Sequence, residues 1–169
     1  MSNIGSNKYV TFSLGSTMFG VSVLKTREIV EYGKITPVPE APYYIKGVIN
    51  LRGAVVPVVD LTKKFFKEDI TLSEMTSIMI VEPTIDNEKN IMGIIVDCVK
   101  DVLELKMENM ESAPKYGAKL KSEYITGVSN YNNEFILILD IDSVLSKVEL
   151  SDSFRMNALN TNVHEDIKE

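Results

Sequence analysis

The chain has 169 residues, enough for one domain or two small lobes with a buried core. Its 18 Lys and Arg against 24 Asp and Glu give a net charge of −6, and the cations form no cluster, which argues against a nucleic-acid or anionic-membrane binder. The amino terminus lacks an apolar signal core, and no run approaches the roughly 18 apolar residues of a membrane span. We therefore expect a soluble, cytoplasmic protein with no direct membrane insertion.

The predicted elements of the first part of the chain are mostly β-strands. Alternation of apolar residues predicts a strand at 9–14, a second strand at 18–23 and a short helical turn that returns to strand over 24–30. A stiff, exposed connection follows, because it holds Pro37, Pro39 and Pro42. Four apolar residues within and before the third segment are expected to be mostly core, with some of them instead lining a cleft between two lobes: Val23, Leu24, Ile29 and Val30.

A hairpin over residues 45–61 comes next and is the most informative stretch. Asn50, Arg52 and Gly53 interrupt two apolar, β-branched runs, which is typical of strand–turn–strand. Arg52 at the tip suits docking to a protein surface better than chemistry: its planar fork could anchor a partner carboxylate, or it could be a solvated turn residue. Pro57 cannot donate to a ladder, so its strand is expected at a sheet edge or at a bulge.

The rest of the chain continues the β pattern. The turn-forming pair Asn132 and Asn133 predicts a tight hairpin near the end. Strands are expected at 77–81, 91–97, 99–106, 124–131 and 135–141, with a polar loop at 84–90 and an irregular link at 108–122.

The sequence also repeats itself. Residues 20–31 resemble 93–104 at an offset of 73, and residues 47–61 resemble 127–141 at an offset of 80. In the second pair the spacing from glycine to aspartate is 13 in both copies. We interpret this as an internal duplication that yields two small β-units with a cleft between them, the alternative being the chance echoes of any β-rich chain.

No catalytic constellation is present in the sequence. The single histidine, His164, lies in a polar segment, and no phosphate loop, dinucleotide fingerprint or serine-hydrolase motif occurs. Asp60 and Asp140 each end an apolar strand before a helix-like segment, so helix capping explains them better than paired catalytic carboxylates. Cys98, the only cysteine, rules out an internal disulfide and is interpreted as a packed small hydrophobe. We expect no enzyme, no metal and no cofactor.

Several of these stretches together resemble the CheW-type chemotaxis coupling proteins. They include YVTFSLG at 9–15, FGVSVLK at 19–25, the specific string NLRG-x-V-x-P-V-x-D-L at 50–61, and GIIVD at 93–97. The resemblance runs from about residue 8 to 148. It implies a mostly β fold of two small, intertwined, five-stranded SH3-like barrels with short helices, a lobe boundary near 80–90, and a tail at 149–169 that could form a loose helix.

The same resemblance implies a function and its residues. A CheW-type protein is a non-enzymatic adaptor that couples the cytoplasmic tips of methyl-accepting chemoreceptors to the regulatory domain of the histidine kinase CheA, in arrays at the membrane. By position, the expected partner-binding residues are Arg52, Glu28, Val30, Val99 and Thr26, with both valines facing a groove. The family often carries valine where this chain has Thr26, and glycine where it has Cys98.

Two other hypotheses stay open at this point. The chain could be the CheW-like module of a CheV-type protein or of a kinase, which would need a receiver domain or an ATP-binding lobe elsewhere. It could also be a β-barrel that binds a ligand in the cleft. An oligonucleotide is the less favoured ligand, because the chain is acidic and has no face that combines aromatic and basic residues.

Overall fold

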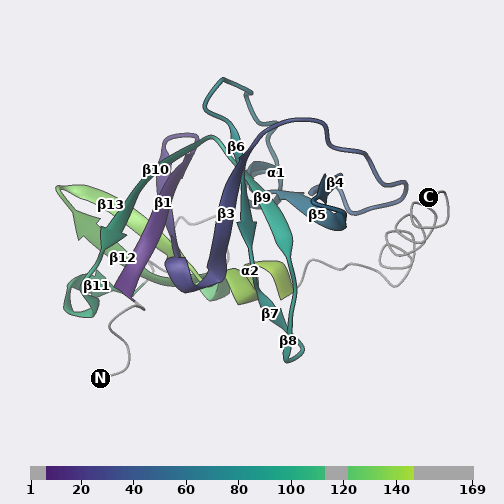
Figure 1. Cartoon of the computed structure of the whole chain (residues 1–169). Helices are drawn as coiled ribbons and strands as arrows, with labels where there is room; N and C mark the ends of the chain where they lie inside the picture. The colour runs from purple at the N-terminus through teal and green to yellow at the C-terminus, as the bar shows by residue number, and fades with distance from the viewer. Residues whose placement is uncertain (1–6, 113–121, 147–169) are drawn as a thin grey trace.

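Figure 1 shows the computed structural model, which describes residues 7–112 and 122–146. The tail expected at 149–169 and part of the link at 108–122 lie outside these residues. The elements are, in chain order, β1 (Lys8–Leu14), β2 (Thr17–Ser22), η2 (Val23–Lys25), β3 (Thr26–Glu31), β4 (Ile45–Leu51), β5 (Ala54–Asp60), α1 (Leu61–Phe66), β6 (Ser77–Val81), β7 (Thr84–Ile85), β8 (Glu88–Lys89), β9 (Met92–Val96), β10 (Cys98–Glu104), η3 (Met107–Asn109), β11 (Met110–Glu111), η4 (Ser122–Tyr124), β12 (Ile125–Tyr131), β13 (Glu134–Leu139) and α2 (Ile141–Ser146).

Two large sheets make up most of the described fold, and the chain passes between them, while β7 and β8 form a separate two-stranded ribbon. The first has the order β10-β1-β2-β13-β12-β11, and the second has the order β3-β6-β9-β5-β4. The chain leaves the first sheet after β2 and returns to it after β9, so each sheet contains strands from both halves of the sequence. The mostly β fold is confirmed. The first sheet differs from the expected five strands by the two-residue β11 at its edge.

The internal repeat is visible in the strand pairing. β2 and β13 pair in parallel, as do β5 and β9, so each sheet contains one such pair. Both hairpins have a register shift next to a glycine at equivalent positions, Gly47 and Gly127. Asp60 and Asp140 cap the helices that follow, accepting bonds from the backbone N–H of residues 63 and 143 at 3.1 Å and 3.3 Å. The capping interpretation of both aspartates is confirmed.

One hydrophobic core joins the two sheets. It combines side chains of the first sheet, such as Phe12 and Phe19, with side chains of the second, such as Val59 and Met79, all of them fully buried. Aromatic rings contact one another across this core. The ring centroid of Phe19 lies 5.9 Å from that of Phe12 and 5.8 Å from that of Phe65 in α1. This shared core fixes how the second sheet, and with it β3, sits against the first.

Three expectations from the sequence need correction. β5 lies between β9 and β4, so Pro57 is not on an edge strand, and the bulge of this hairpin is on β4 at Gly47. The parallel pairing with β9 begins at Val58, one residue after the proline, which is how an interior strand accommodates it. The loop at 84–90 contains the β7–β8 ribbon. Cys98 is only half-buried, with its Sγ 3.4 Å from the carbonyl of Val99.

Candidate functional site

The edge strand β3 gathers three of the five expected partner-binding residues. Its residues alternate strictly: Thr26, Glu28 and Val30 are half-buried, and the residues between them are exposed. Among the described strands, β3 pairs with β6 alone, because it is the first strand of its sheet. The strand therefore offers both a free backbone edge and an exposed face.

The tip of the β4–β5 hairpin holds Arg52 in an unusual backbone conformation. Arg52 and Gly53 both have positive φ, 51° and 89°, and the Asn50 side chain accepts a bond from the Gly53 N–H at 2.9 Å. Tight hairpins favour Asn or Gly at such positions, and left-handed backbone costs other residues about 1–2 kcal/mol. The equivalent turn of the β12–β13 hairpin has the favoured residue type, Asn132 followed by Asn133. An arginine at this tip is thus not explained by the turn itself.

Arg52 reaches across to Glu28 of β3. The guanidinium donates from Nη1 to Oε1 at 3.1 Å and from Nη2 to Oε2, a bidentate ion pair between the hairpin tip and the edge strand. The hydrogen bond from Arg52 lowers the pKa of Glu28, and the pairing raises the pKa of Arg52. The arginine side chain remains 67% exposed and the glutamate 30%. The fork expected to anchor a partner carboxylate is therefore occupied within the chain, and the other guanidinium N–H donors take no part in this pair.

The other three expected partner-binding residues are half-buried and have contacts within the chain. Val30 is half-buried and packs against the core of the second sheet, formed by residues such as Ile78 and Ile95. Val99, on β10 of the first sheet, is also half-buried, but it packs against the core shared by both sheets. The Thr26 hydroxyl donates to the Ser22 carbonyl at 3.1 Å. The structure thus brings Arg52 and Glu28 into contact, and it assigns the two valines to separate clusters.

Two apolar residues expected in the core are instead exposed at this site. Leu24 of η2 is 66% exposed and Ile29 of β3 is 45% exposed, so the prediction of core positions was wrong for both. Strict alternation along β3 could have identified Ile29, since it shares a face with Arg27 and Glu31. Exposed apolar side chains that form a patch with a polar rim are typical of protein-binding surfaces, whereas isolated ones are common on any protein.

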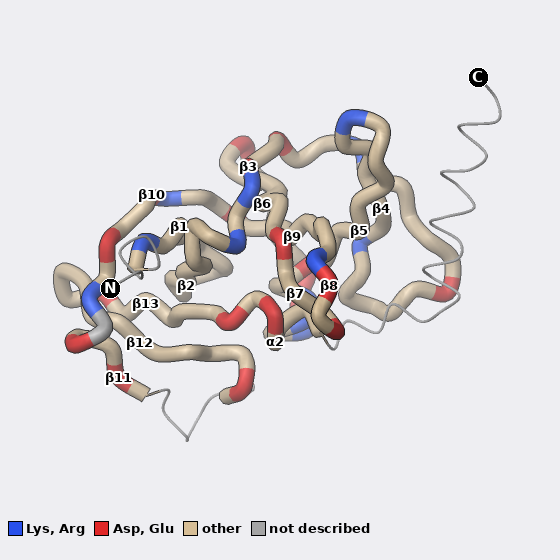
Figure 2. The backbone as a smooth tube through the Cα atoms, turned by 60° about the horizontal axis from the view of Figure 1, so that its bottom comes forward, with Lys and Arg blue, Asp and Glu red and all other residues tan. Residues whose placement is uncertain are grey.

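Charges around the site are mixed rather than gathered by sign. Figure 2 shows lysine and arginine interspersed with aspartate and glutamate over the described part of the chain. Arg27 Nη1 lies 2.6 Å from Glu82 Oε2, and Lys89 Nζ lies 3.8 Å from the other oxygen of the same carboxylate. β3 therefore makes ion pairs from both of its faces, through Arg27 and Glu28.

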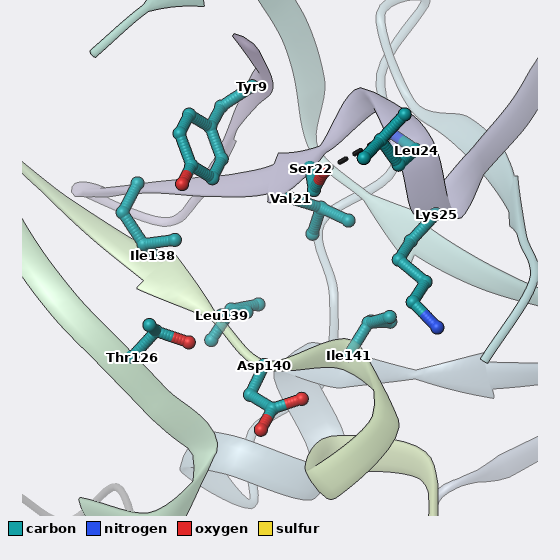
Figure 3. A pocket seen from close by; sticks show the side chains of 10 residues that line it. All are labelled: Tyr9, Val21, Ser22, Leu24, Lys25, Thr126, Ile138, Leu139, Asp140 and Ile141. Atoms are coloured by element: carbon teal, nitrogen blue, oxygen red, sulfur yellow. Dashed lines mark hydrogen bonds between the residues drawn. The ribbon is translucent and has the colours of Figure 1, made fainter. Parts of the chain in front are cut away.

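A pocket of about 230 Å³ opens beside the start of β3. Figure 3 shows η2 residues such as Leu24 and Lys25 along one side of it and Leu139 to Ile141 on the opposite side. It lies where the parallel pair β2 and β13 diverges, since their pairing ends at Gly20 and Ile138.

Among the described residues, no group of three or more His, Cys, Asp or Glu side chains could hold a metal. None of the described helices is long and apolar enough to cross a membrane.

Comparisons with known proteins agree with this architecture. A family model described as CheW-like domain matches residues 8–149. The chain belongs to the CheW-like family. The chemotaxis protein CheW of Klebsiella aerogenes is 34% identical to it over 144 residues, which cover 85% of this chain and 84% of that protein. The chemotaxis protein CheW of Treponema pallidum is 31% identical over 141 residues, covering 83% of each.

A solved relative supports the same family. The crystal structure of the scaffolding protein TtCheW from Thermoanaerobacter tengcongensis superposes with a TM-score of 0.71 at 32% identity, covering 80% of this chain and 85% of that one. The resemblance inferred from the NLRG string and its neighbours is thus confirmed, and so is the CheW fold. CheW family proteins are scaffolds rather than enzymes, which fits a site built from exposed apolar residues and ion pairs.

Proposed function

We propose that this protein is a chemotaxis adaptor that couples the cytoplasmic tips of methyl-accepting chemoreceptors to the regulatory domain of the histidine kinase CheA. The observation that carries the proposal is the family match over residues 8–149, together with relatives of similar length named chemotaxis protein CheW. An adaptor of this kind has no catalytic step of its own. It is recruited to receptor arrays at the membrane through its protein contacts.

The receptor contact in this proposal is at β3. A receptor tip is a helical hairpin, and amphipathic helices dock through apolar anchors into a groove. The exposed Leu24 and Ile29 supply apolar surface, and Thr26, Glu28 and Val30 line the inner face of the strand. Val99 belongs to the same groove in this proposal, and Arg52 presents its unused N–H groups beside Glu28.

The kinase contact is placed on a separate surface, at one end of a sheet. A protein that couples two partners must bind both at once, so the two surfaces cannot coincide. Small, transient contacts of this type are weak, with Kd on the order of micromolar. An array gains strength because many such contacts act together.

Calorimetric titration of the full chain with a receptor cytoplasmic fragment and with the kinase regulatory domain, separately and together, tests the proposal. We expect micromolar binding to each and a ternary complex with both. Leu24→Ala should weaken receptor binding, whereas Leu72→Ala, which truncates a leucine of comparable exposure outside η2 and β3, should leave it unchanged. Failure to bind either partner, or competition between the two for one surface, would contradict the adaptor function.

A further inference from the structure

Three residues far apart in sequence meet beside the start of β3. Lys25, the last residue of η2, has its Nζ 3.1 Å from Asp142 Oδ2 in α2 and donates to the Thr84 hydroxyl of β7 at 3.1 Å. The second carboxylate oxygen, Asp142 Oδ1, accepts a bond from the Thr84 N–H at 2.8 Å. The ammonium, the carboxylate and the threonine thus form a closed polar triangle between three elements.

This triangle is the polar link that holds η2 to α2. None of the three residues of η2 is buried, and Leu24 is mostly exposed, so within the described part of the chain the partly buried Val23 is the residue through which apolar burial attaches this segment to the core. The pocket of about 230 Å³ separates η2 from the strand end before α2, where side-chain packing would otherwise hold them together. With little packing, the position of η2 depends on the Lys25 contacts.

η2 in turn determines where β3 begins. Thr26 follows Lys25 directly, and the Lys25 carbonyl accepts a bond from the Glu82 N–H at 2.8 Å. Glu82 also pairs with Arg27, so the first residues of β3 are fixed relative to the segment that leads into β7. A shift of Lys25 would be passed to Thr26 and Glu28, because they belong to the same short strand.

We propose that Lys25, Asp142 and Thr84 form a positioning clamp that sets how the chain passes from β2 of the first sheet into β3 of the second, and thereby controls receptor binding. The clamp rests on the proposed function, since it positions the receptor-binding strand without contacting the receptor. Lys25 is two-thirds buried at its side chain and its charge is already paired. Its role is therefore to hold β3, not to bind a partner carboxylate.

The decisive experiment is a double-mutant cycle in receptor affinity on the full chain, with the receptor cytoplasmic fragment as the probe. Lys25→Met removes the charge at similar length, and Asp142→Asn keeps the shape. We expect each to weaken receptor binding on the order of tenfold, which corresponds to about 1.4 kcal/mol. Because both break one clamp, the double variant should be no weaker than either single variant. Lys25→Arg should retain most of the affinity.

Two further readouts separate positioning from general stability. Affinity for the kinase regulatory domain should stay within about twofold of that of the parent protein. A variant that had lost its fold would instead bind both the receptor and the kinase more weakly. Amide exchange of Thr26 to Val30 should accelerate in Lys25→Met while the core of the first sheet keeps its protection. Lys89→Met is the matched control. It removes a lysine whose side chain is 78% exposed and which belongs to the neighbouring ion pair with Glu82, and it should change neither readout.

Specific results would overturn the clamp. Multiplicative losses in the double variant would show that Lys25 and Asp142 act independently, and a parallel loss of receptor and kinase binding would show a structural role only. If Lys25→Met fails to fold, Thr84→Val removes only the hydroxyl acceptor and must give the same selective loss. Absence of binding by the parent protein refutes the proposed function, whereas normal binding that the variants leave intact refutes the clamp alone.

Discussion

Arg52 is the residue at which local conformation and side-chain interaction oppose each other. Its left-handed backbone is unfavourable for arginine, and the repeat-related hairpin shows that Asn fits the same turn. The compensation is the bidentate pair with Glu28, but exposed ion pairs contribute only about 0–1 kcal/mol to folding. Stability alone therefore gives little reason for an arginine here. Residues that cost stability often serve binding.

We expect Arg52→Asn to separate these two effects. The free energy of unfolding should stay the same or rise by up to about 1 kcal/mol, because the turn is relieved while a weak pair is lost. The free energy of binding to a partner should become less favourable by roughly 1–3 kcal/mol, as for other charged hydrogen-bonding groups at interfaces. Urea unfolding and calorimetric titration measure the two quantities on the same sample.

Arg52→Lys serves as the control because it keeps the charge without the planar fork, and it should recover only part of the affinity. The pKa of Glu28, followed by NMR, should rise in Arg52→Asn because the hydrogen bond that lowers it is gone. A carboxyl with a lowered folded-state pKa stabilises the fold above its unfolded-state pKa and loses that effect as the pH falls through the folded value. Unchanged affinity for both partners would mean that Arg52 only ties the hairpin to β3.

The helix caps are features of secondary structure that the local sequence predicts correctly. Asp60 and Asp140 follow apolar strands, and both cap short helices as their positions predict. The turn residues Asn50, Arg52 and Gly53 in the same way marked the first hairpin, whereas β3 was predicted only as a helical turn that returns to strand. The β7–β8 ribbon escaped prediction because strands of two residues have no measurable period. The place of β5 inside the sheet depends on its pairing with β9, which lies more than thirty residues later in the chain.

Asp60 differs from its repeat partner in burial, and this leads to a prediction for α1. Asp60 is only 6% exposed, and burial is the main cause that raises its pKa. A raised folded-state pKa favours folding at low pH, so this contribution is lost as the pH rises from the ordinary Asp value through the folded value. We expect Asp60→Asn, which keeps the capping oxygen, to match or exceed the parent stability at pH 7. Asp60→Ala should lose about 1 kcal/mol.

Urea unfolding between pH 4 and pH 8 checks this prediction, with the difference between Asn and parent expected to grow with pH, roughly in step with ionisation of a single carboxyl. Asp140→Asn is the matched control at a more exposed cap. Equal destabilisation by Asp60→Asn and Asp60→Ala would show that the charge of Asp60 is needed for its attraction to Lys46 and Lys63, and would contradict the burial argument.

At the scale of the whole molecule, the duplicated motifs predicted two related β-units, and the family strings predicted their fold. Strand exchange gives these units one continuous core, and periodicity in the sequence contains no information on which side chains meet across it. Lys25 and Asp142 are 117 positions apart, and Arg52 and Glu28 are 24 apart. Such contacts depend on how the sheets curve and pack, so the sequence could place Arg52 at a hairpin tip but could not show that its side chain pairs with Glu28.

The shared core predicts that damage to one sheet will unfold both. Gly47 has φ +150°, and a Cβ there would lie 2.1 Å from the Thr36 carbonyl oxygen, where two backbone hydrogen bonds join Thr36 to Val48. The backbone cannot yield without losing those bonds, so Gly47→Ala should cost about 3 kcal/mol or more. Gly127→Ala, at the repeat-related position, should cost less because its Cβ would mainly meet the flexible side chain of Met110.

Native-state amide exchange tests whether that loss spreads through the molecule. In Gly47→Ala, slow amides in β12 and β13 of the first sheet should lose as much protection as those in β5 and β9, because Phe19 and Val59 belong to one core. Thermal unfolding should remain a single transition at a lower midpoint. If β12 and β13 kept the protection of the parent protein, the two sheets would be separate folding units despite their exchanged strands.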